Sequence, residues 1–212
     1  MTRLSTPSRA ARWLFALCSV SACALVLAAT PAPQLGDPAP VPKPAPEALA
    51  TVPRAKTVIV VRHAEKDAAG DPQDPHLGEA GQKRAKALAA LLRKSGASAL
   101  FASEFHRTRD TLAPLATELG LTVETVSARD AAALVKRIDA LPAGATVVVA
   151  GHSNTVPGLL ALLGAELPGV VDAGKAKNLA EDAFGRVFVV TLPPPTARMH
   201  VATTTVELST DP

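Results

Sequence analysis

The apolar positions of this chain fall into two kinds of pattern. Val58–Val61 is an unbroken run of β-branched residues, and Thr146–Ala150 is a second apolar run of similar length. Such runs are typical of strands that lie inside a parallel sheet and are covered on both faces. Glu79–Lys94 instead places leucines on one face and basic residues on others, which predicts an amphipathic helix.

Strand and helix patterns alternate through the centre of the chain, which favours an α/β fold. We expect a three-layer sandwich with a mainly parallel central sheet and helices on both faces. The last strand alternates polar and apolar residues and is expected at a sheet edge. Gly164–Asp182 shows no regular pattern and is expected to be irregular. The other strands are predicted at Ala99–Ala102, Leu121–Val126, Val187–Leu192 and Val201–Leu208, and the other helices at Phe105–Leu119, Asp130–Leu141 and Thr155–Leu163.

Both central strands end in residues that carry chemistry. Arg62 and His63 follow the first run directly, and the second run leads into Gly151–Asn154, which contains His152. Open α/β sheets bind ligands beyond the carboxyl ends of their strands. We therefore expect the two histidines to meet at one edge of the sheet.

The first 53 residues differ in composition from the rest. Residues 1–12 contain three arginines and no acid, and Trp13–Ala29 is apolar apart from two serines. This pattern predicts a signal peptide or an N-terminal membrane anchor over residues 1–30. Pro31–Pro53 holds eight prolines among small residues, which indicates an extended linker over residues 31–53. One domain is expected over residues 54–212, in an exported protein that is periplasmic or secreted.

The leader has three possible fates. Val20–Cys23 resembles a bacterial lipobox, in which the cysteine is acylated, although Ala24–Ala29 continues the apolar run beyond it. The 17 residues Trp13–Ala29 are at the short end for a membrane span, so an uncleaved anchor is the second possibility. Cleavage near Ala28 or Ala29 is the interpretation we prefer.

Cysteine and charge content exclude several classes of function. Cys18 and Cys23 both lie in the leader, so we expect no disulfide, cysteine nucleophile or cysteine-ligated zinc in the domain. From Arg54 onward the chain has 18 Lys and Arg against 17 Asp and Glu, a net charge of +1. This balance gives no reason to expect a nucleic-acid partner. Membrane contact is expected only through the N-terminal segment.

Four short motifs together resemble the histidine phosphatase superfamily, which includes the cofactor-dependent phosphoglycerate mutases. Arg62–Ala64 resembles the family's Arg-His-Gly or Arg-His-Ala, and Ser103–Thr111 resembles its S-x-x-x-R-x-x-x-T segment. Gly151–Ser153 matches Gly-His-Ser, and Leu77–Gly81 matches a weaker L-x-x-x-G element. The motifs occur in the family's order over about residues 57–163, which is more specific than any one of them.

The resemblance implies a role for each residue of the expected site. Arg62 and Arg107 are expected to clamp a phosphoryl group, because a guanidinium can donate two parallel hydrogen bonds to it. His63 is expected to be the nucleophile, kept neutral by repulsion from the arginines. His152 is expected to stabilise charge on the transferring group, and Asn154 to contact substrate. No cofactor and no metal are expected.

A metal site is the rival interpretation of the same histidines. It would use His63, Glu65, His76 and His152 as ligands held in close geometry. His76 lies in a proline-rich loop, and Arg62 would place a cation beside the metal, so we prefer the phosphoryl site. His106 and His200 are expected to be an exposed helix-start residue and a structural residue.

A proton donor for the leaving group is the weakest part of the site. Mutase-like members carry a glutamate after the second arginine, and the matching interval here offers Glu124 and Asp130 without a recognisable motif. Phosphohistidine phosphatases manage without such an acid, because imidazole leaves readily. Either residue, or neither, is therefore a candidate.

We expect an exported phosphatase that hydrolyses phosphomonoesters through a phosphohistidine. Its substrate would be a small phosphorylated compound or a phosphorylated envelope component. The alternatives are a phosphohistidine phosphatase, a mutase-like phosphotransferase, or a noncatalytic anion-binding envelope protein. The 44 residues between Arg107 and His152 leave no room for the cap that a mutase uses to exclude water, and all four residues of the expected site are retained.

Overall fold

The structure is a computed structural model, and it describes residues 54–165, 171–173, 176–194 and 200–208. The expected leader and linker, and with them the three fates of the leader, lie outside the described residues. Within the described parts, we find no helix with the length and hydrophobicity needed to span a membrane.

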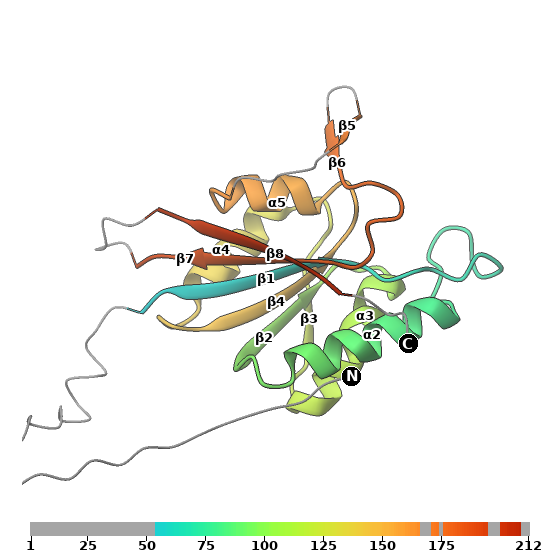
Figure 1. The fold of residues 1–212 in the computed structure, drawn as a ribbon, viewed down its shortest axis with the longest axis horizontal. Helices are drawn as coiled ribbons and strands as arrows, with labels where there is room; N and C mark the ends of the chain where they lie inside the picture. Colours follow the sequence, from blue (N-terminus) through green and yellow to red (C-terminus); the bar gives the residue numbers. More distant parts are fainter. Residues whose placement is uncertain (1–53, 166–170, 174–175, 195–199, 209–212) are drawn as a thin grey trace, which may run out of the picture. The chain divides into compact units, whose positions relative to one another are not determined.

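A six-stranded sheet with the order β3-β2-β4-β1-β7-β8 forms the centre of the domain (Figure 1). The first four strands in this order are parallel, and β7 and β8 join antiparallel. β8 lies at the edge, as its alternating pattern predicts. The strand bounds are β1 (Lys56–Arg62), β2 (Ala97–Ala102), β3 (Val123–Thr125), β4 (Thr146–Gly151), β7 (Arg186–Leu192) and β8 (Ala202–Glu207).

Helices cover both faces of this sheet. Figure 1 shows α2 (Glu79–Leu92) and α3 (His106–Leu119) on one face, and α4 (Ala131–Ala140) and α5 (Val156–Leu162) on the other. Alternate residues of β1 enter the two hydrophobic clusters between these layers, which explains why its apolar run has no polar interruption. The predicted three-layer α/β architecture is confirmed, with two antiparallel strands added on one side.

The segment predicted to be irregular, Gly164–Asp182, contains two short strands. β5 (Val171–Ala173) pairs antiparallel with β6 (Ala176–Asn178) in a separate two-stranded sheet. Three residues are too few to show a period of two in the sequence, so the prediction was wrong here. The predicted strand Leu121–Val126 is likewise shorter in the structure, where only Val123–Thr125 pairs with β2.

A glycine lets α2 pack directly on the chain that follows β1. Gly81 is buried in α2, and a Cβ at this position would overlap the backbone carbonyl of Glu65. Because Glu65 lies two residues after His63, this close approach helps to fix the backbone that carries the histidine. The L-x-x-x-G element at Leu77–Gly81 therefore has a packing role.

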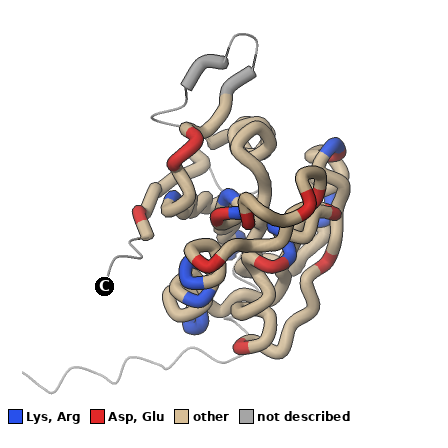
Figure 2. The backbone as a smooth tube through the Cα atoms, turned by 90° about the vertical axis from the view of Figure 1, so that its right-hand side faces the viewer, with Lys and Arg blue, Asp and Glu red and all other residues tan. Residues whose placement is uncertain are grey.

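Charged residues are mixed over the domain. Figure 2 shows Lys and Arg interspersed with Asp and Glu along the described chain. Pairs such as Arg186 with Glu207 and Arg137 with Glu124 bring opposite charges together at the surface. This arrangement agrees with the near-neutral charge of the domain.

Candidate active site

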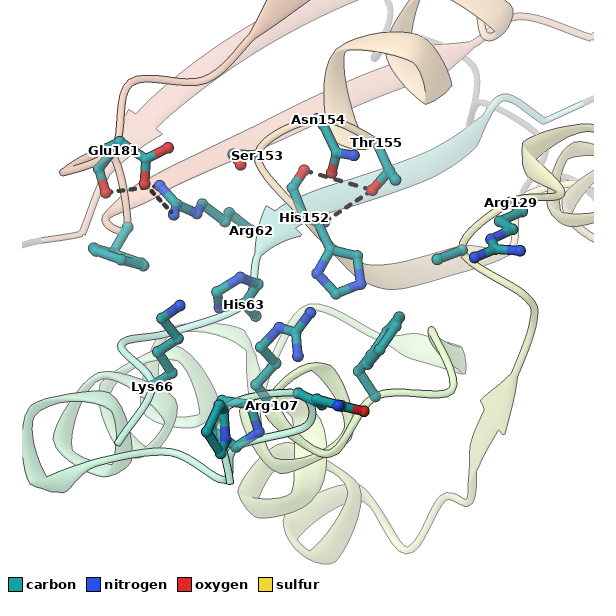
Figure 3. Close-up of a pocket in the computed structure, with 16 residues that line it drawn as sticks. Arg62, His63, Lys66, Arg107, Arg129, His152, Ser153, Asn154, Thr155 and Glu181 are labelled. Atoms are coloured by element: carbon teal, nitrogen blue, oxygen red, sulfur yellow. Dashed lines mark hydrogen bonds and ion pairs between the residues drawn. The ribbon is translucent and has the colours of Figure 1, made fainter. Parts of the chain in front are cut away.

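The ends of β1 and β4 bring the two expected histidines together. Arg62 and Gly151 are partners in the parallel register, and the backbone N–H of His63 donates to the Gly151 carbonyl at 2.8 Å. The rings of His63 and His152 meet edge to face with centroids 5.3 Å apart, and Figure 3 shows the two side chains near each other. The side chains are 6% and 7% exposed. The expected convergence of the two histidines is confirmed.

One hydrogen bond defines the tautomer of His63. Its Nδ1 lies 2.8 Å from the carbonyl oxygen of Ala64. A carbonyl only accepts, so Nδ1 carries the proton, and Nε2 of the neutral ring keeps its lone pair. Nε2 is therefore the nitrogen with an electron pair to offer to an electrophile.

Burial keeps His63 neutral. It lowers the pKa of His63 to about 4, with the Ala64 carbonyl opposing the shift and repulsion from Arg62 and Arg107 adding to it. The direction agrees with the sequence-based expectation, but desolvation, not the arginines, is the larger cause.

Thr111 of the S-x-x-x-R-x-x-x-T segment ties α3 to the histidine. Its hydroxyl accepts from the backbone N–H of Ala64 at 2.9 Å and donates to the Arg107 carbonyl at 2.7 Å. A single side chain thus joins the residue after His63 to the helix turn that carries Arg107. This bond gives the threonine of that segment a positioning role.

A chain of hydroxyls holds the ring of His152. Its Nε2 lies 2.9 Å from Ser103 Oγ, which lies 2.8 Å from Thr108 Oγ1, which in turn donates to the Phe105 carbonyl at 2.8 Å. Since the chain ends at an acceptor, Ser103 donates to Thr108 and accepts the proton of His152 Nε2. Burial, followed by repulsion from Arg107 and His63, lowers the pKa of His152 to about 4.

Arg62 is anchored by backbone carbonyls and an aromatic ring. The side chain is 5% exposed, and its Nη1 donates to the carbonyls of Ala180 and Glu181 at 2.9 and 2.8 Å. Its guanidinium carbon lies 4.1 Å from the centre of the Phe184 ring. Its buried Nε has no hydrogen-bond partner among the described residues.

Arg107 reaches the site from the first turn of α3. Its Nη1 lies 3.7 Å from a carboxylate oxygen of Asp74, and its guanidinium carbon lies 4.3 Å from the centre of the Phe105 ring. Each arginine therefore stacks on a phenylalanine ring. The stacking restricts the orientation of the guanidinium and does not use its N–H groups as donors.

These side chains line a cavity of about 530 Å³. Arg62, His63, Arg107, His152 and Asn154, all expected from the sequence, contribute to its wall. Lys66 and Arg129 add two further cations that sequence reasoning missed (Figure 3). Lys66 follows His63 by three residues at the same strand end, and this position could have predicted that it lines the cavity. No pattern in the sequence marks Arg129.

The candidate proton donors do not reach the cavity. Glu124 pairs with Arg137 at 2.7 Å on the surface, and Asp130 caps α4 by accepting from the Ala133 N–H at 2.8 Å. Among the described residues that line the cavity, Glu181 is the only carboxylate, and its side chain is 92% exposed. Of the three alternatives left open by the sequence, Glu124, Asp130 or neither, the structure places neither carboxylate in the cavity wall, and both make structural contacts elsewhere.

The rival metal set is not assembled. Glu65 forms a salt bridge with Arg84 at 2.6 Å, and His76 Nδ1 lies 2.7 Å from Asp110. In the described parts of the chain, the group of metal-ligating side chains that does come together is His76, His106 and Asp110. His106, expected to be simply exposed, packs its ring against His76 with centroids 4.1 Å apart.

Known proteins resemble this chain in sequence and in fold. Residues 58–130 match the family described as "Histidine phosphatase superfamily (branch 1)". An 8-oxo-(d)GTP phosphatase of Mycolicibacterium smegmatis is 32% identical over 117 residues, which are 50% of this chain and 36% of that protein. The chain thus spans about a third of the length of this curated relative.

Solved structures share the fold. "Mycobacterial hydrolase 1" aligns with a TM-score of 0.53 at 17% identity, over 74% of this chain and 99% of the other. A mycobacterial glucosyl-3-phosphoglycerate phosphatase aligns with a TM-score of 0.48, also at 17% identity, over 74% of this chain and 100% of the other. The likeness to the first structure agrees with the α/β architecture described above.

Proposed function

We propose that this chain, which belongs to the histidine phosphatase superfamily, is a phosphatase that hydrolyses phosphomonoesters through a phosphohistidine on His63. The observation that carries the proposal is the state of His63. Its ring is neutral and oriented by the Ala64 carbonyl, and it lines a cavity whose wall also includes two arginines. A neutral imidazole next to the positive charges of arginine side chains is the arrangement that in-line attack on a phosphoryl group needs.

The reaction has two steps. In the first, His63 Nε2 attacks phosphorus, the P–N bond forms, and the bond from phosphorus to the leaving oxygen breaks with its electron pair on the leaving group. In the second, water attacks the same phosphorus, the P–N bond breaks, and phosphate is released with the water's proton passing to solvent. Arg62 and Arg107 balance the charge on the phosphoryl oxygens in both steps.

His152 is placed to respond to the bound anion. In the free site the Nε2–H of His152 donates a hydrogen bond to Ser103 Oγ, so Nδ1 of the neutral ring holds a lone pair. A phosphoryl dianion in the cavity favours protonation of His152, because opposite charge raises the pKa of an imidazole. The protonated ring then donates from Nδ1 as well and adds a third cation beside the two arginines.

Among the described residues that line the cavity, no carboxylate is held in a fixed position, which favours substrates with good leaving groups. Glu181, the carboxylate among the described lining residues, is almost fully exposed and lies 3.5 Å from Arg62. An aliphatic alcohol leaves poorly without a proton donor, whereas a phenol, a phosphate or an imidazole leaves without one. A phosphohistidine phosphatase is therefore the second candidate function.

We also propose that the protein is exported, with a phosphorylated envelope component or a small phosphorylated compound as substrate. This proposal is supported by the composition of residues 1–53 alone, with its basic start, apolar stretch and proline-rich linker. Detection of the protein in the periplasmic or secreted fraction checks it, and retention of an intact leader in the cytoplasmic fraction contradicts it.

Burst kinetics with an aryl phosphate test the covalent mechanism. A fast-leaving aryl group loads His63 quickly and makes hydrolysis of the phosphoenzyme limiting, so phenol release should start with a burst close to one equivalent per active site. Quenching in base should preserve phosphate on His63, because phosphoimidazole is stable in base and is lost in acid. Peptide mapping locates the label.

The control for this experiment is His200→Ala, which removes an exposed histidine and should keep the burst. If aryl phosphates of different leaving ability give neither a burst nor a label on His63, water attacks the bound phosphate directly. His63 would then be a general base or an anion ligand.

A further inference from the structure

A second group of histidines lies near the cavity and has carboxylate neighbours. His76, His106 and Asp110 each offer one ligand atom, and these atoms lie within 4.8 Å of one another. His106 and Asp110 are four residues apart on α3, so they project from the same face of the helix. His76 comes from the loop that precedes α2 and brings the third ligand from outside the helix.

The ligand set suits a borderline divalent metal. Zn²⁺ takes imidazole nitrogen and carboxylate oxygen at about 2.0–2.2 Å, and ligand atoms on one tetrahedral ion lie about 3.3 Å apart. The atoms of this group need to move little to reach that separation. Two imidazoles and one carboxylate would fill three positions of a tetrahedral Zn²⁺ ion and leave the fourth to water.

The group is also open to an incoming ion. The side chains of His76, His106 and Asp110 are 66%, 42% and 33% exposed. A second carboxylate adds negative charge: Asp74 lies 3.8 Å from His106 Nε2, and it accepts from the backbone N–H of His106 at 2.8 Å. The cluster therefore combines ligand atoms, charge and access.

We propose that His76, His106 and Asp110 form a binding site for one Zn²⁺ ion, separate from the phosphoryl site. The bound ion joins the loop that contains His76 to the first turns of α3. The test below measures zinc binding and thermal stability, so its outcome is independent of whether the protein is a phosphatase.

Binding here has a structural consequence for the cavity. The loop residues Pro72, Gln73 and Pro75 line the cavity wall, and Arg107 directly follows His106. An ion that holds His76 on α3 also holds this stretch of wall next to Arg107. The zinc site would thus stabilise the rim of the cavity while the reaction itself takes place on other residues.

Arg109 competes with the metal. Its Nη2 lies 3.0 Å from His106 Nδ1, so a cationic side chain already contacts one of the ligands. Zn²⁺ must displace this guanidinium or repel it. Arg109→Ala should therefore bind zinc more tightly than the parent chain, an effect that an ion bound elsewhere on the surface would not show.

The experiment titrates the full chain with zinc chloride in competition with a chromophoric chelator. Every variant, including the parent, carries Cys18→Ser and Cys23→Ser, because thiolates bind zinc. The parent should bind one ion per chain. His76→Ala, His106→Ala and Asp110→Asn should each weaken binding by at least about 10- to 100-fold.

Two controls locate the site. His200→Ala removes an exposed histidine outside the group, and His63→Ala removes one of the cavity histidines. Both should retain the zinc affinity of the parent. If His63→Ala loses zinc and His76→Ala keeps it, the ion binds in the cavity and the proposal is wrong.

Thermal stability supplies a second measurement. Zinc should raise the Tm of the parent, because an ion that binds only the folded chain stabilises it, and the rise should disappear in Asp110→Asn, which keeps the shape of the side chain. Equal zinc affinity in the parent and all three ligand variants, or no binding in any of them, overturns the proposal.

Discussion

Two pairs of histidines, built from the same residue type, have opposite surroundings in this domain. His63 and His152 are buried near arginines, and their rings are hydrogen-bonded to the Ala64 carbonyl and the Ser103 hydroxyl respectively. His76 is exposed and His106 is partly exposed, and their neighbours include the carboxylates of Asp110 and Asp74 as well as the guanidinium of Arg109. In both pairs the rings are in contact, with centroids 5.3 and 4.1 Å apart.

The comparison shows that the neighbours of a histidine determine its chemistry. Burial and repulsion by cations keep the first pair neutral, and in the proposed reaction the same cations attract a phosphoryl anion. Nearby carboxylates attract a metal cation to the second pair. One pair is therefore suited to an anionic substrate and the other to a cationic ligand.

His63→Ala should produce the largest effect and separates the two pairs most clearly. Loss of the nucleophile should lower kcat for phosphate release by about 10⁴-fold or more while the domain remains folded. Phosphate release from a purified aryl phosphate measures the loss, and circular dichroism checks the fold. Turnover within about tenfold of the parent would remove the nucleophile assignment.

Arg107→Ala should have the next largest effect. In the proposed mechanism its guanidinium supplies one of the two clamps on the phosphoryl group, so kcat/KM should fall by about 10²- to 10³-fold. The matched control is Arg137→Ala, which breaks an exposed pair with Glu124 and should leave kcat/KM unchanged. Equal losses in the two variants would mean that Arg107 acts only through stability.

Gly81→Ala tests the packing that places His63. A Cβ here meets the Glu65 carbonyl, so the free energy of unfolding should fall by about 1–3 kcal/mol or more. Gly158→Ala in α5 is the control, because a Cβ at Gly158 has no atom within 4 Å, and it should be neutral or slightly stabilising. Urea denaturation measures both variants. A stable Gly81→Ala would show that α2 can move away from this segment.

Acidification should affect the buried pair through its lowered pKa. The folded-state pKa of His63, about 4, lies below the ordinary value of 6.5, so the unfolded chain binds protons more readily as the pH falls. Stability should therefore decrease between pH 6.5 and 4, and His63 should contribute roughly 1–2 kcal/mol of this loss between pH 7 and 5.

The measurement compares the pH dependence of the free energy of unfolding in the parent and in His63→Ala. The contributions of the carboxylates are common to both and cancel in the difference. His63→Ala should lose less stability on acidification than the parent does. The acid limb of kcat/KM, after correction for ionisation of the substrate, should likewise lie near pH 4. An acid limb near pH 6.5 would contradict a neutral, desolvated His63.

A chelator should have the smallest effect on catalysis. All the charge assigned to stabilising the phosphoryl group comes from side chains, so EDTA should leave kcat within about twofold of the untreated enzyme. The same treatment should abolish the zinc-dependent rise in Tm. Loss of activity in EDTA with recovery on adding a divalent ion would place the metal in the reaction itself.

Local patterns in the chain were enough to predict the fold class and the principal residues of the cavity. An unbroken apolar run removes all its side chains from water only in a strand that is buried on both faces. For this reason β1 and β4 were predictable as central parallel strands. The polar residues at the ends of such strands must meet at one edge. For this reason the places of Arg62, His63 and His152 followed from local sequence.

Which charged side chains line the cavity and which support the scaffold depends on how distant segments pack, and no local pattern predicts it. Glu124 and Asp130 lie in the right interval of the sequence, yet one pairs with Arg137 and the other caps α4. Arg129 lines the cavity although no sequence pattern marks it. A strand is defined by a local pattern, whereas the partner of a charge depends on where distant segments pack. The sorting of the four histidines into a buried pair among cations and an exposed pair among carboxylates was settled in the same way, because it depends on how the loop before α2 lies against α3.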